Sequence, residues 1–466
     1  MGRGLLQNLI LYLAAMSSSH KIGYNTAVAI VIANMIGTGV FTSLGYQVID
    51  IQSGFAILML WIVGGVLALC GAFTYGEIGA AFPESGGEYN YLSKLYHPAL
   101  GFLSGWVSVT VGFAAPIALA SVALSKYVNR IYTSVNPATL SITVIVVITI
   151  IHSINLKAGG IFQRGFTWVK VICILMFIGF GLFYKPDAIA LASGGFASFV
   201  PDGNALACVF SSAFATSLIY VTYAYSGWNA AAYISGEMKN VKRNLPRALF
   251  MGTAVVMIIY TALNYIFLYT VPVNELKGVT EVGDLSANKI FGQQVGQFMS
   301  IVIAVLLVST ISAMILAGPR VMQRMGNNIH GLRFFATANK NNVPYVAIIF
   351  QSIIAITLVI TSSFEALVNY VGFTLNIFTF LTVFGVFILR RKFSHLKTAY
   401  KTPLYPVTPV LFLLIILWIS FNIIRQKPLE SVMGLATVLA GLVIYLLTNR
   451  LSKKSQQTDQ PDSLSR

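Results

Sequence analysis

The sequence predicts an all-α integral membrane protein with twelve transmembrane helices. Three observations lead to this prediction: 56% of the 466 residues are hydrophobic, only 9% are charged, and long apolar runs recur along the whole chain. A soluble domain averages about 25% charged residues, so the composition excludes an ordinary water-soluble globule. Transmembrane β-barrels would instead show alternating segments of about ten residues. The net charge of +16 also occurs in nucleic-acid-binding proteins, but so apolar a chain is not expected to bind nucleic acid.

Apolar runs of about 18 or more residues predict the individual spans. In chain order the predicted spans are residues 24–45, 54–81, 99–125, 139–156, 161–184, 207–236, 245–271, 295–320, 343–361, 366–390, 406–424 and 428–448. Clusters of Gly, Pro and polar residues separate them, as at residues 83–87 after the second span.

The distribution of Lys and Arg predicts the orientation of the chain. With a cytoplasmic N-terminus, 22 of the 30 cations fall in inner segments and seven in outer loops, while Lys170 alone falls inside a span. Cytoplasmic loops are enriched in Lys and Arg, so both termini are expected in the cytoplasm and the protein in the plasma (inner) membrane. Residues 1–23 would form a cytoplasmic segment, with translation hypothesised to begin at Met16. Residues 449–466 would form a cytoplasmic tail, disordered from Ser452.

Two spans contain residues that interrupt helices. Residues 35–41 (MIGTGVF) place two glycines near the middle of the first span, and residues 223–229 (YAYSGWN) place small and polar residues at a similar depth in the sixth. Small residues also allow close helix packing, but non-helical backbone at membrane depth survives where it lines an enclosed cavity. The five-span separation predicts two inverted repeats, residues 24–184 and 207–390, followed by two further spans within residues 406–448.

Four ordered stretches resemble a known superfamily of permeases. They are GTGVF at 37–41; YGEIG at 75–79 with PESGGEY at 83–89; AYSGWN at 224–229 with GEM at 236–238 and RNLPRA at 243–248; and YKTP at 400–403 with YP at 405–406. On these motifs the chain resembles the amino acid–polyamine–organocation (APC) superfamily, and within it the L-type amino acid transporter branch. The resemblance covers roughly residues 22 to 425, and it implies a LeuT-type 5+5 fold with discontinuous helices 1 and 6.

The same resemblance implies a substrate site at the two breaks. In such transporters the substrate carboxylate meets the amides of the first break, which correspond to Thr38 and Gly39 beside Gly37. The substrate amine meets backbone carbonyls, which here are those of Met35, Ile36, Tyr223, Ala224 and Ser226. Tyr223 matches an aromatic gate over the substrate, although a membrane-core tyrosine is the simpler alternative, and Asn229 is expected to contact the substrate side chain.

Lys170 is the one cation predicted at membrane depth, about 9 Å beyond Arg164 at 1.5 Å per residue. A long side chain that reaches the interface is one alternative. By resemblance, its ammonium occupies the place of a sodium ion in sodium-coupled relatives. Its expected neighbours are carbonyls of the first break and the hydroxyl of Ser309, Thr310 or Ser312. Proton exchange at Lys170 stays open as a second role.

The positions of the carboxylates bear on the substrate. Eight lie in or beside outer loops, two in the tail, and four near inner helix ends, namely Glu77, Glu84, Glu88 and Glu237. None is left at mid-membrane to pair with a cationic substrate, so neutral L-amino acids are expected. The function expected is sodium-independent secondary transport by alternating access, through exchange. Proton symport and facilitated diffusion stay open as alternatives, and the preferred amino acids and the oligomeric state are left open.

Other classes of function have little support in the sequence. A channel or a membrane-embedded enzyme would need a filter motif or a polar catalytic cluster, and neither is visible. No cofactor or metal is expected, since His20 and His152 lack partners at ligand spacing and no phosphate-binding loop appears. In mammalian L-type transporters, a Cys in the outer loop between spans three and four links a single-span heavy-chain glycoprotein. The corresponding residues 126–138 contain no Cys, so no covalent heavy-chain partner is expected. The expected partners are the amino acid substrate and membrane lipid.

Overall fold

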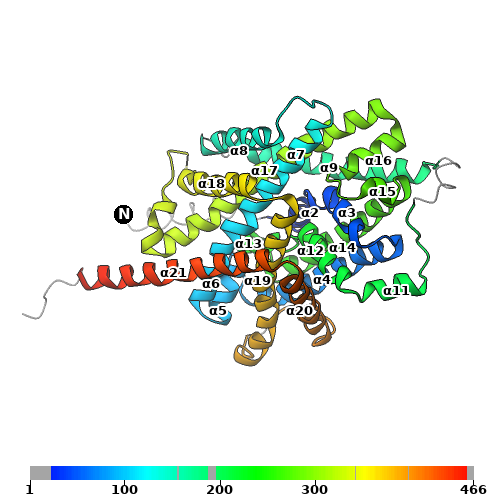
Figure 1. Cartoon of the computed structure of the whole chain (residues 1–466). Coiled ribbons are helices and arrows are strands. Elements are labelled where there is room, and N and C mark those ends of the chain that lie inside the picture. The colour runs from blue at the N-terminus through cyan, green and yellow to red at the C-terminus, as the bar shows by residue number, and fades with distance from the viewer. Residues whose placement is uncertain (1–21, 155–156, 187–195, 342, 397, 459–466) are drawn as a thin grey trace, which may run out of the picture.

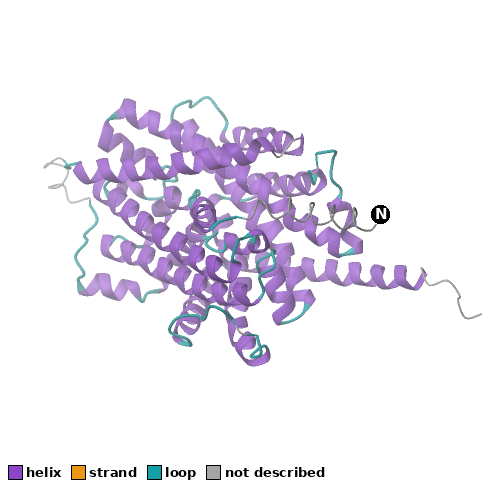
Figure 2. Cartoon of the chain, turned by 180° about the vertical axis from the view of Figure 1, so that it is seen from behind, coloured by secondary structure: helices purple, strands orange, loops and turns teal. Residues whose placement is uncertain are grey.

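The computed structural model describes residues 22–154, 157–186, 196–341, 343–396 and 398–458. The hypothesised start at Met16 and most of the predicted N-terminal segment lie outside these residues. The described part is helical and contains no strand, apart from one isolated parallel bridge between Ile22 and Met238 (Figure 2).

The first half of the chain supplies a series of helices, some of them broken. They are α2 (Tyr24–Met35), α3 (Gly39–Asp50), α4 (Gly54–Ala81), α5 (Glu88–Leu95), α6 (Pro98–Val107), the π-helix η1 (Ser108–Phe113), α7 (Ala114–Asn129), α8 (Pro137–Ile154) and α9 (Lys157–Phe183). The sixth predicted span contains α11 (Gly203–Val209), α12 (Ser212–Tyr225), α13 (Ala230–Tyr233) and the 3₁₀ turn η2 (Ser235–Glu237).

The second half contains longer helices. They are α14 (Val241–Thr270), α15 (Val273–Leu276), α16 (Val282–Phe291), α17 (Gln293–Asn328), the 3₁₀ helix η3 (His330–Ala336), α18 (Tyr345–Thr361), α19 (Phe364–Lys392), α20 (Val407–Gln426) and α21 (Pro428–Thr458).

Each of the twelve predicted spans contains helix in the described residues, but the presence of helix does not fix the number of spans that cross a membrane. In the described part, eight helices are long and apolar enough to cross, or ten when the bent pairs α2–α3 and α11–α12 each count as one span. Residues 168–183 and α18 are shorter apolar helices. The count of twelve and the pairing into two five-span repeats therefore stay predictions.

The structure differs from the sequence-based expectations at three places. The sixth span was expected to be helical from residue 207, but α11 and α12 meet at 61°, and α12 begins where the hydroxyl of Ser211 accepts the amide of Phe214 at 3.1 Å. The third span contains the unexpected π-helix η1. The tail was expected to be disordered from Ser452, whereas α21 continues to Thr458, since Lys and Gln are good helix formers.

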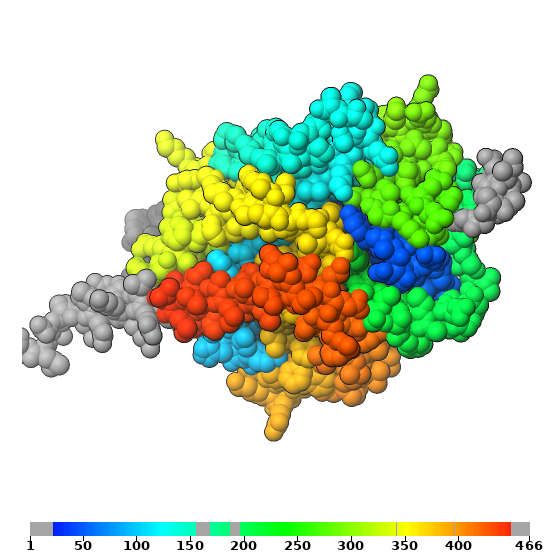
Figure 3. Space-filling model, in the orientation of Figure 1, coloured from blue at the N-terminus to red at the C-terminus, as the bar shows by residue number. Residues whose placement is uncertain are grey.

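The helices that surround the bundle expose large apolar side chains. Ile150 of α8 is 55% exposed, and Leu414 and Phe421 of α20 are each 59% exposed. Figure 1 shows α8 and α18 on one side of the molecule and α20 on the other, while α21 runs across the face seen in Figure 3. Apolar surface of this extent would be unfavourable in water, and together with the long apolar helices it defines a multi-pass membrane protein.

Candidate functional site

The first break separates α2 from α3 by Ile36, Gly37 and Thr38, and the two helices are bent by 40°. The helix α3 starts at Gly39, so its first amides have no acceptor within the helix itself. The last carbonyls of α2 are likewise left without helical partners. The break therefore presents a partial positive charge on one side and a partial negative charge on the other.

The second break follows α12. Ser226 donates its amide to the carbonyl of Tyr223 at 2.9 Å, and Gly227 then adopts a φ of +96°, which ends the helix. A Cβ at Gly227 would lie 2.8 Å from the carbonyl oxygen of Asn34, so this turn also needs a glycine because it passes close to α2. Asn229 follows directly before α13.

The two breaks are held in direct contact. A Cβ at Gly39 would lie 2.5 Å from the Cα of Ala224, so only glycine allows α3 to approach α12 this closely. On the other side, the hydroxyl of Tyr260 in α14 donates to the carbonyl of Met35 at 2.5 Å and lies 3.4 Å from the carbonyl oxygen of Ala224. Two of the carbonyls predicted to receive a substrate amine are thus oriented by one tyrosine.

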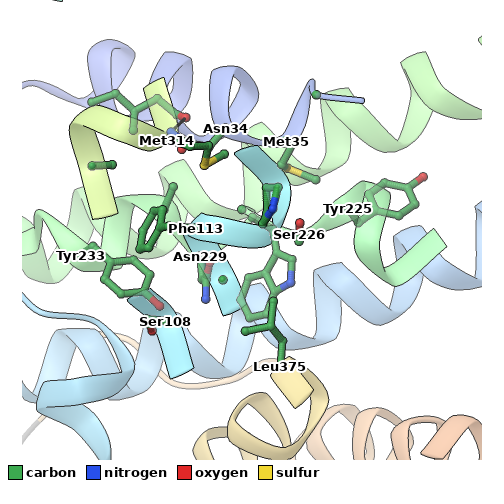
Figure 4. Close-up of a pocket in the computed structure, with 18 of the residues that line it drawn as sticks. Asn34, Met35, Ser108, Phe113, Tyr225, Ser226, Asn229, Tyr233, Met314 and Leu375 are labelled. Carbon is green, nitrogen blue, oxygen red and sulfur yellow. Dashed lines mark hydrogen bonds between the residues drawn. The ribbon is translucent and has the colours of Figure 1, made fainter. Parts of the chain in front are cut away.

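A cavity of about 730 Å³ opens at the breaks. Eight of the nine predicted substrate-site residues line it: Met35, Gly37, Thr38, Gly39, Tyr223, Ala224, Ser226 and Asn229. The ninth, Ile36, is buried. Figure 4 shows Asn34 and Met35 on one side of Ser226 and Asn229, with Ser108 and Leu375 on the opposite side. The volume of the cavity lies within the range of small-molecule binding sites.

The lining of the cavity extends from the breaks toward one end of the helix bundle. Its lining reaches Asn25 at the start of α2, Ser85 in the loop after α4, Glu237 in η2 and Arg320 near the end of α17. These residues belong to the segments that the distribution of cations predicts to be cytoplasmic. The structure therefore has the cavity open toward the predicted cytoplasmic face.

Toward the other face, polar and aromatic contacts close the route. The hydroxyls of Thr38 and Tyr223 are 2.7 Å apart, which joins the last residue of the first break to α12. Farther along, Tyr46 of α3 stacks on Tyr220 of α12 and on Phe364 of α19, with ring centroids 5.8 Å and 5.5 Å apart.

Lys170 lies behind the first break. Its side chain is buried, and the ammonium donates to the hydroxyl of Thr310 at 2.7 Å and to the carbonyl of Ile36 at 3.3 Å. Both acceptors were among those expected from the sequence. The interfacial position considered as an alternative is inconsistent with this burial. Lys170 joins three segments that lie far apart in the chain: α9, the first break and α17.

The two other hydroxyls considered as neighbours of Lys170 are buried in α17. The hydroxyl of Ser312 lies 2.7 Å from Nε2 of His152 in α8, so its described contact is with another helix. Ser309 has an interaction of its own. Among the described residues, no group of three His, Cys, Asp or Glu side chains could hold a metal ion.

Several residues of the cavity were not predicted from the sequence. Glu88 of α5 lines it and accepts a hydrogen bond from the side-chain amide of Asn229 at 3.1 Å. Ser108 and Phe113 line it from η1, and Tyr260 holds the carbonyls behind it. The sequence placed Glu88 only near an inner helix end, and nothing in the apolar sequence around Tyr260 distinguishes it from a core tyrosine.

Comparison with known proteins identifies the class. A family model described as "Amino acid permease" matches residues 22–445, which is most of the chain. The chain therefore belongs to the amino acid permease family, within the APC superfamily, and resembles its L-type branch. This family and its named relatives are transporters, which points away from an enzyme.

Three relatives illustrate the similarity. The serine/threonine exchanger SteT of Bacillus subtilis is 29% identical over 432 residues, covering 91% of this chain and 96% of the relative. The human b(0,+)-type amino acid transporter 1 is 27% identical over 441 residues, covering 92% and 88%. The human large neutral amino acids transporter small subunit 2 is 26% identical over 438 residues, covering 92% and 80%.

Proposed function

We propose that this chain exchanges neutral L-amino acids across the plasma membrane, without sodium, by alternating access. The observation that carries the proposal is the cavity formed jointly by the two helix breaks. An α-amino acid carries a carboxylate and an ammonium on one carbon, and the breaks offer amides of α3 beside carbonyls of α2 and α12. These opposite partial charges match the two groups of the substrate.

The side chains at the breaks favour a neutral substrate. Thr38, Tyr223 and Ser226 line the cavity and are uncharged. The residue predicted to contact the substrate side chain, Asn229, carries a neutral amide. The two carboxylates that line the cavity, Glu88 and Glu237, belong to α5 and η2 on the predicted cytoplasmic side. The residues of the breaks themselves supply no carboxylate for a cationic side chain, and an unpaired charge is costly at membrane depth.

Lys170 supports sodium independence. Its ammonium donates hydrogen bonds to the carbonyl of Ile36 and the hydroxyl of Thr310, so a cation of the chain itself occupies the place that the family resemblance gives to sodium. Exchange is favoured over other coupling modes because one relative that the chain matches over 96% of its length is named a serine/threonine exchanger. Proton symport remains the competing mode.

The conformation supports alternating access. The cavity opens toward the predicted cytoplasmic face, and the contact between Thr38 and Tyr223 closes the opposite side. Transport then requires the reverse arrangement, in which this contact opens and the cytoplasmic end closes. The proposed moving units are the two inverted repeats, residues 24–184 and 207–390, with residues 406–448 as an additional helix pair and both termini in the cytoplasm.

Reconstitution of the chain alone into proteoliposomes tests the proposal. Efflux of a loaded neutral amino acid should accelerate when a neutral amino acid is added outside, and should be unchanged by external sodium. Arginine outside should fail to accelerate it. Efflux that ignores external amino acid but follows a pH gradient would replace exchange with proton symport, and stimulation by sodium would refute the role given to Lys170. No second chain is needed for activity if the proposal is right.

A further inference from the structure

Glu88 is a buried carboxylate in the wall of the cavity. It is the first residue of α5, it is 4% exposed, and it lines the same cavity as the two breaks. The described hydrogen bonds to its side chain both end on Oε1, one from the hydroxyl of Tyr75 at 2.6 Å and one from the side-chain amide of Asn229 at 3.1 Å. Both donors are uncharged.

Cations in the neighbourhood have other partners or are exposed. Lys94 of the same helix pairs with Glu84 at 2.5 Å, and Arg390 of α19 pairs with Glu77 of α4 at 2.8 Å. Arg320 and Arg324 of α17 line the cavity, but their side chains are exposed, as is that of Glu237 in η2. The remaining titratable neighbours of Glu88 are the phenols of Tyr75, Tyr91 and Tyr233.

A buried carboxylate without a cation is held in its charged form only at a cost. Burial raises the pKa of Glu88 to about 7, against the lowering effect of the hydrogen bonds from Tyr75 and Asn229. The group thus changes charge near physiological pH, and it does so in contact with the second break. A hydrogen bond to a carboxylate is roughly twice as strong as one to a neutral carboxyl group.

We propose that Glu88 is a proton-binding site of the cavity, and that its charge controls how firmly Asn229 and the second break are held. The ionised carboxylate binds the amide of Asn229 tightly and stabilises the arrangement that is open to the cytoplasm. A proton from water in the cavity adds to the carboxylate, weakens this hydrogen bond and frees the second break to move. The proposal rests on the proposed transport function and adds a dependence on cytoplasmic pH.

Infrared difference spectroscopy of the detergent-purified protein tests the proton site without any transport. Spectra recorded between about pH 5 and pH 9, on either side of the expected midpoint, should show a protonated carboxyl band that disappears around pH 7. The band should be absent in Glu88→Gln. It should persist in Glu84→Gln, which removes an exposed carboxylate of the same loop. A band that survives in Glu88→Gln overturns the assignment of the proton site, whatever the protein transports.

Exchange in proteoliposomes then tests the consequence. The wild-type rate should fall about fivefold as the pH rises through 7, in line with the difference between charged and neutral hydrogen bonds. Glu88→Gln should keep the acidic rate throughout, Glu88→Asp should restore a pH dependence, and Glu84→Gln should match the wild type. An unchanged pH profile in an active, folded Glu88→Gln protein would overturn the coupling. Loss of exchange in the wild type at every pH would instead refute the proposed function.

Discussion

Two buried carboxylates near the predicted cytoplasmic face have opposite kinds of partner. Glu77 of α4 accepts two hydrogen bonds from the guanidinium of Arg390, both at 2.8 Å, and one from the amide of Thr402 at 2.7 Å. Arg390 also stacks on the ring of Tyr405, 3.6 Å from its centroid. Glu88, close by in sequence, accepts hydrogen bonds only from neutral groups. The first site is a clamp that joins α4, α19 and the loop before α20.

The difference shows that a buried charge can either hold parts of the fold rigidly together or change its protonation state, depending on its partners. In the clamp of Glu77, Arg390 and Thr402, the counter-charge is part of the fold, so the charge is permanent. The partners of Glu88 in the cavity wall and of Lys170 behind the first break are uncharged. Their bonds therefore depend on the charge state and on the conformation of the breaks. The clamp belongs to the scaffold, and the cavity wall to the part that we propose to move.

Breaking the clamp should have the largest effect on stability. Glu77→Gln leaves Arg390 without its partner, and removal of one member of a buried ion pair costs about 4 kcal/mol. Thermal unfolding in detergent should show a clear fall in the melting temperature. Arg391→Gln, which removes a neighbouring exposed cation, should leave it unchanged. A Glu77→Gln protein that melts with the wild type would mean that the clamp does not stabilise the fold.

Glu88→Gln should raise the melting temperature rather than lower it, and the size of this increase should depend on pH. The pKa of Glu88 is raised from 4.5 to about 7, so the folded protein binds more protons than the unfolded chain between these values. The contribution of Glu88 to wild-type stability should therefore be largest below about pH 4.5 and fall until about pH 7, by at most about 3 kcal/mol.

A neutral glutamine at position 88 does not titrate, so the variant does not lose stability in this way as the pH rises. At about pH 8, above the shifted pKa, Glu88→Gln should melt higher than the wild type, and below about pH 4.5 the two should be alike. Glu84→Gln provides the comparison for an exposed carboxylate. A Glu88→Gln protein that is less stable than the wild type at alkaline pH would place Glu88 with the clamp rather than with the cavity wall.

Removal of Lys170 should impair exchange more than folding. Lys170→Ala leaves the carbonyl of Ile36 and the hydroxyl of Thr310 without the ammonium, and a buried polar group left unpaired costs about 1–3 kcal/mol. We expect at least about a tenfold loss of exchange, since 1.4 kcal/mol corresponds to a factor of ten. Lys94→Ala, at a surface ion pair, should exchange normally. Normal exchange by folded Lys170→Ala would exclude a role for the ammonium at the first break.

The smallest effect is expected at the closed side of the cavity. Tyr223→Phe removes the hydroxyl contact with Thr38, a neutral hydrogen bond worth about 1 kcal/mol. Access from the outer face should rise about fivefold, measured as labelling of a cysteine introduced at Ser226 in both backgrounds. Thr38→Val should give the same change, because it removes the other half of the contact. A change in only one variant would show that the contact does not act as the closing bond.

Much of the site was predictable because its signals are local. Glycines and small polar residues at membrane depth predicted both breaks, and the structure ends α2 at Met35 and α12 at Tyr225. The depth of Lys170 among apolar neighbours predicted burial, and Thr310 is one of the three hydroxyls expected beside it.

What escaped prediction depends on contacts between distant segments. A carboxylate at a helix start usually complements the helix dipole at the surface. Only the packing of α4, α5 and α13 around Glu88 makes it a cavity residue. Tyr260 reaches the carbonyl of Met35 across 225 positions of sequence. The bend between α11 and α12 follows from the cap at Ser211, a signal that was present in the sequence but hidden within an apolar stretch.

The π-helix η1 has a consequence for the register of the third span. A π-turn accommodates one more residue than an α-turn, so every side chain after it is rotated by about 100°. Ser108, the first residue of η1, lines the cavity. Downstream, the hydroxyl of Tyr127 reaches the carbonyl of Phe41 at 3.3 Å and accepts the amide of Gly283 at 3.2 Å. Deleting a single residue within η1 would turn Tyr127 away from both, so one inserted position sets the alignment between the inner cavity and the outer loops.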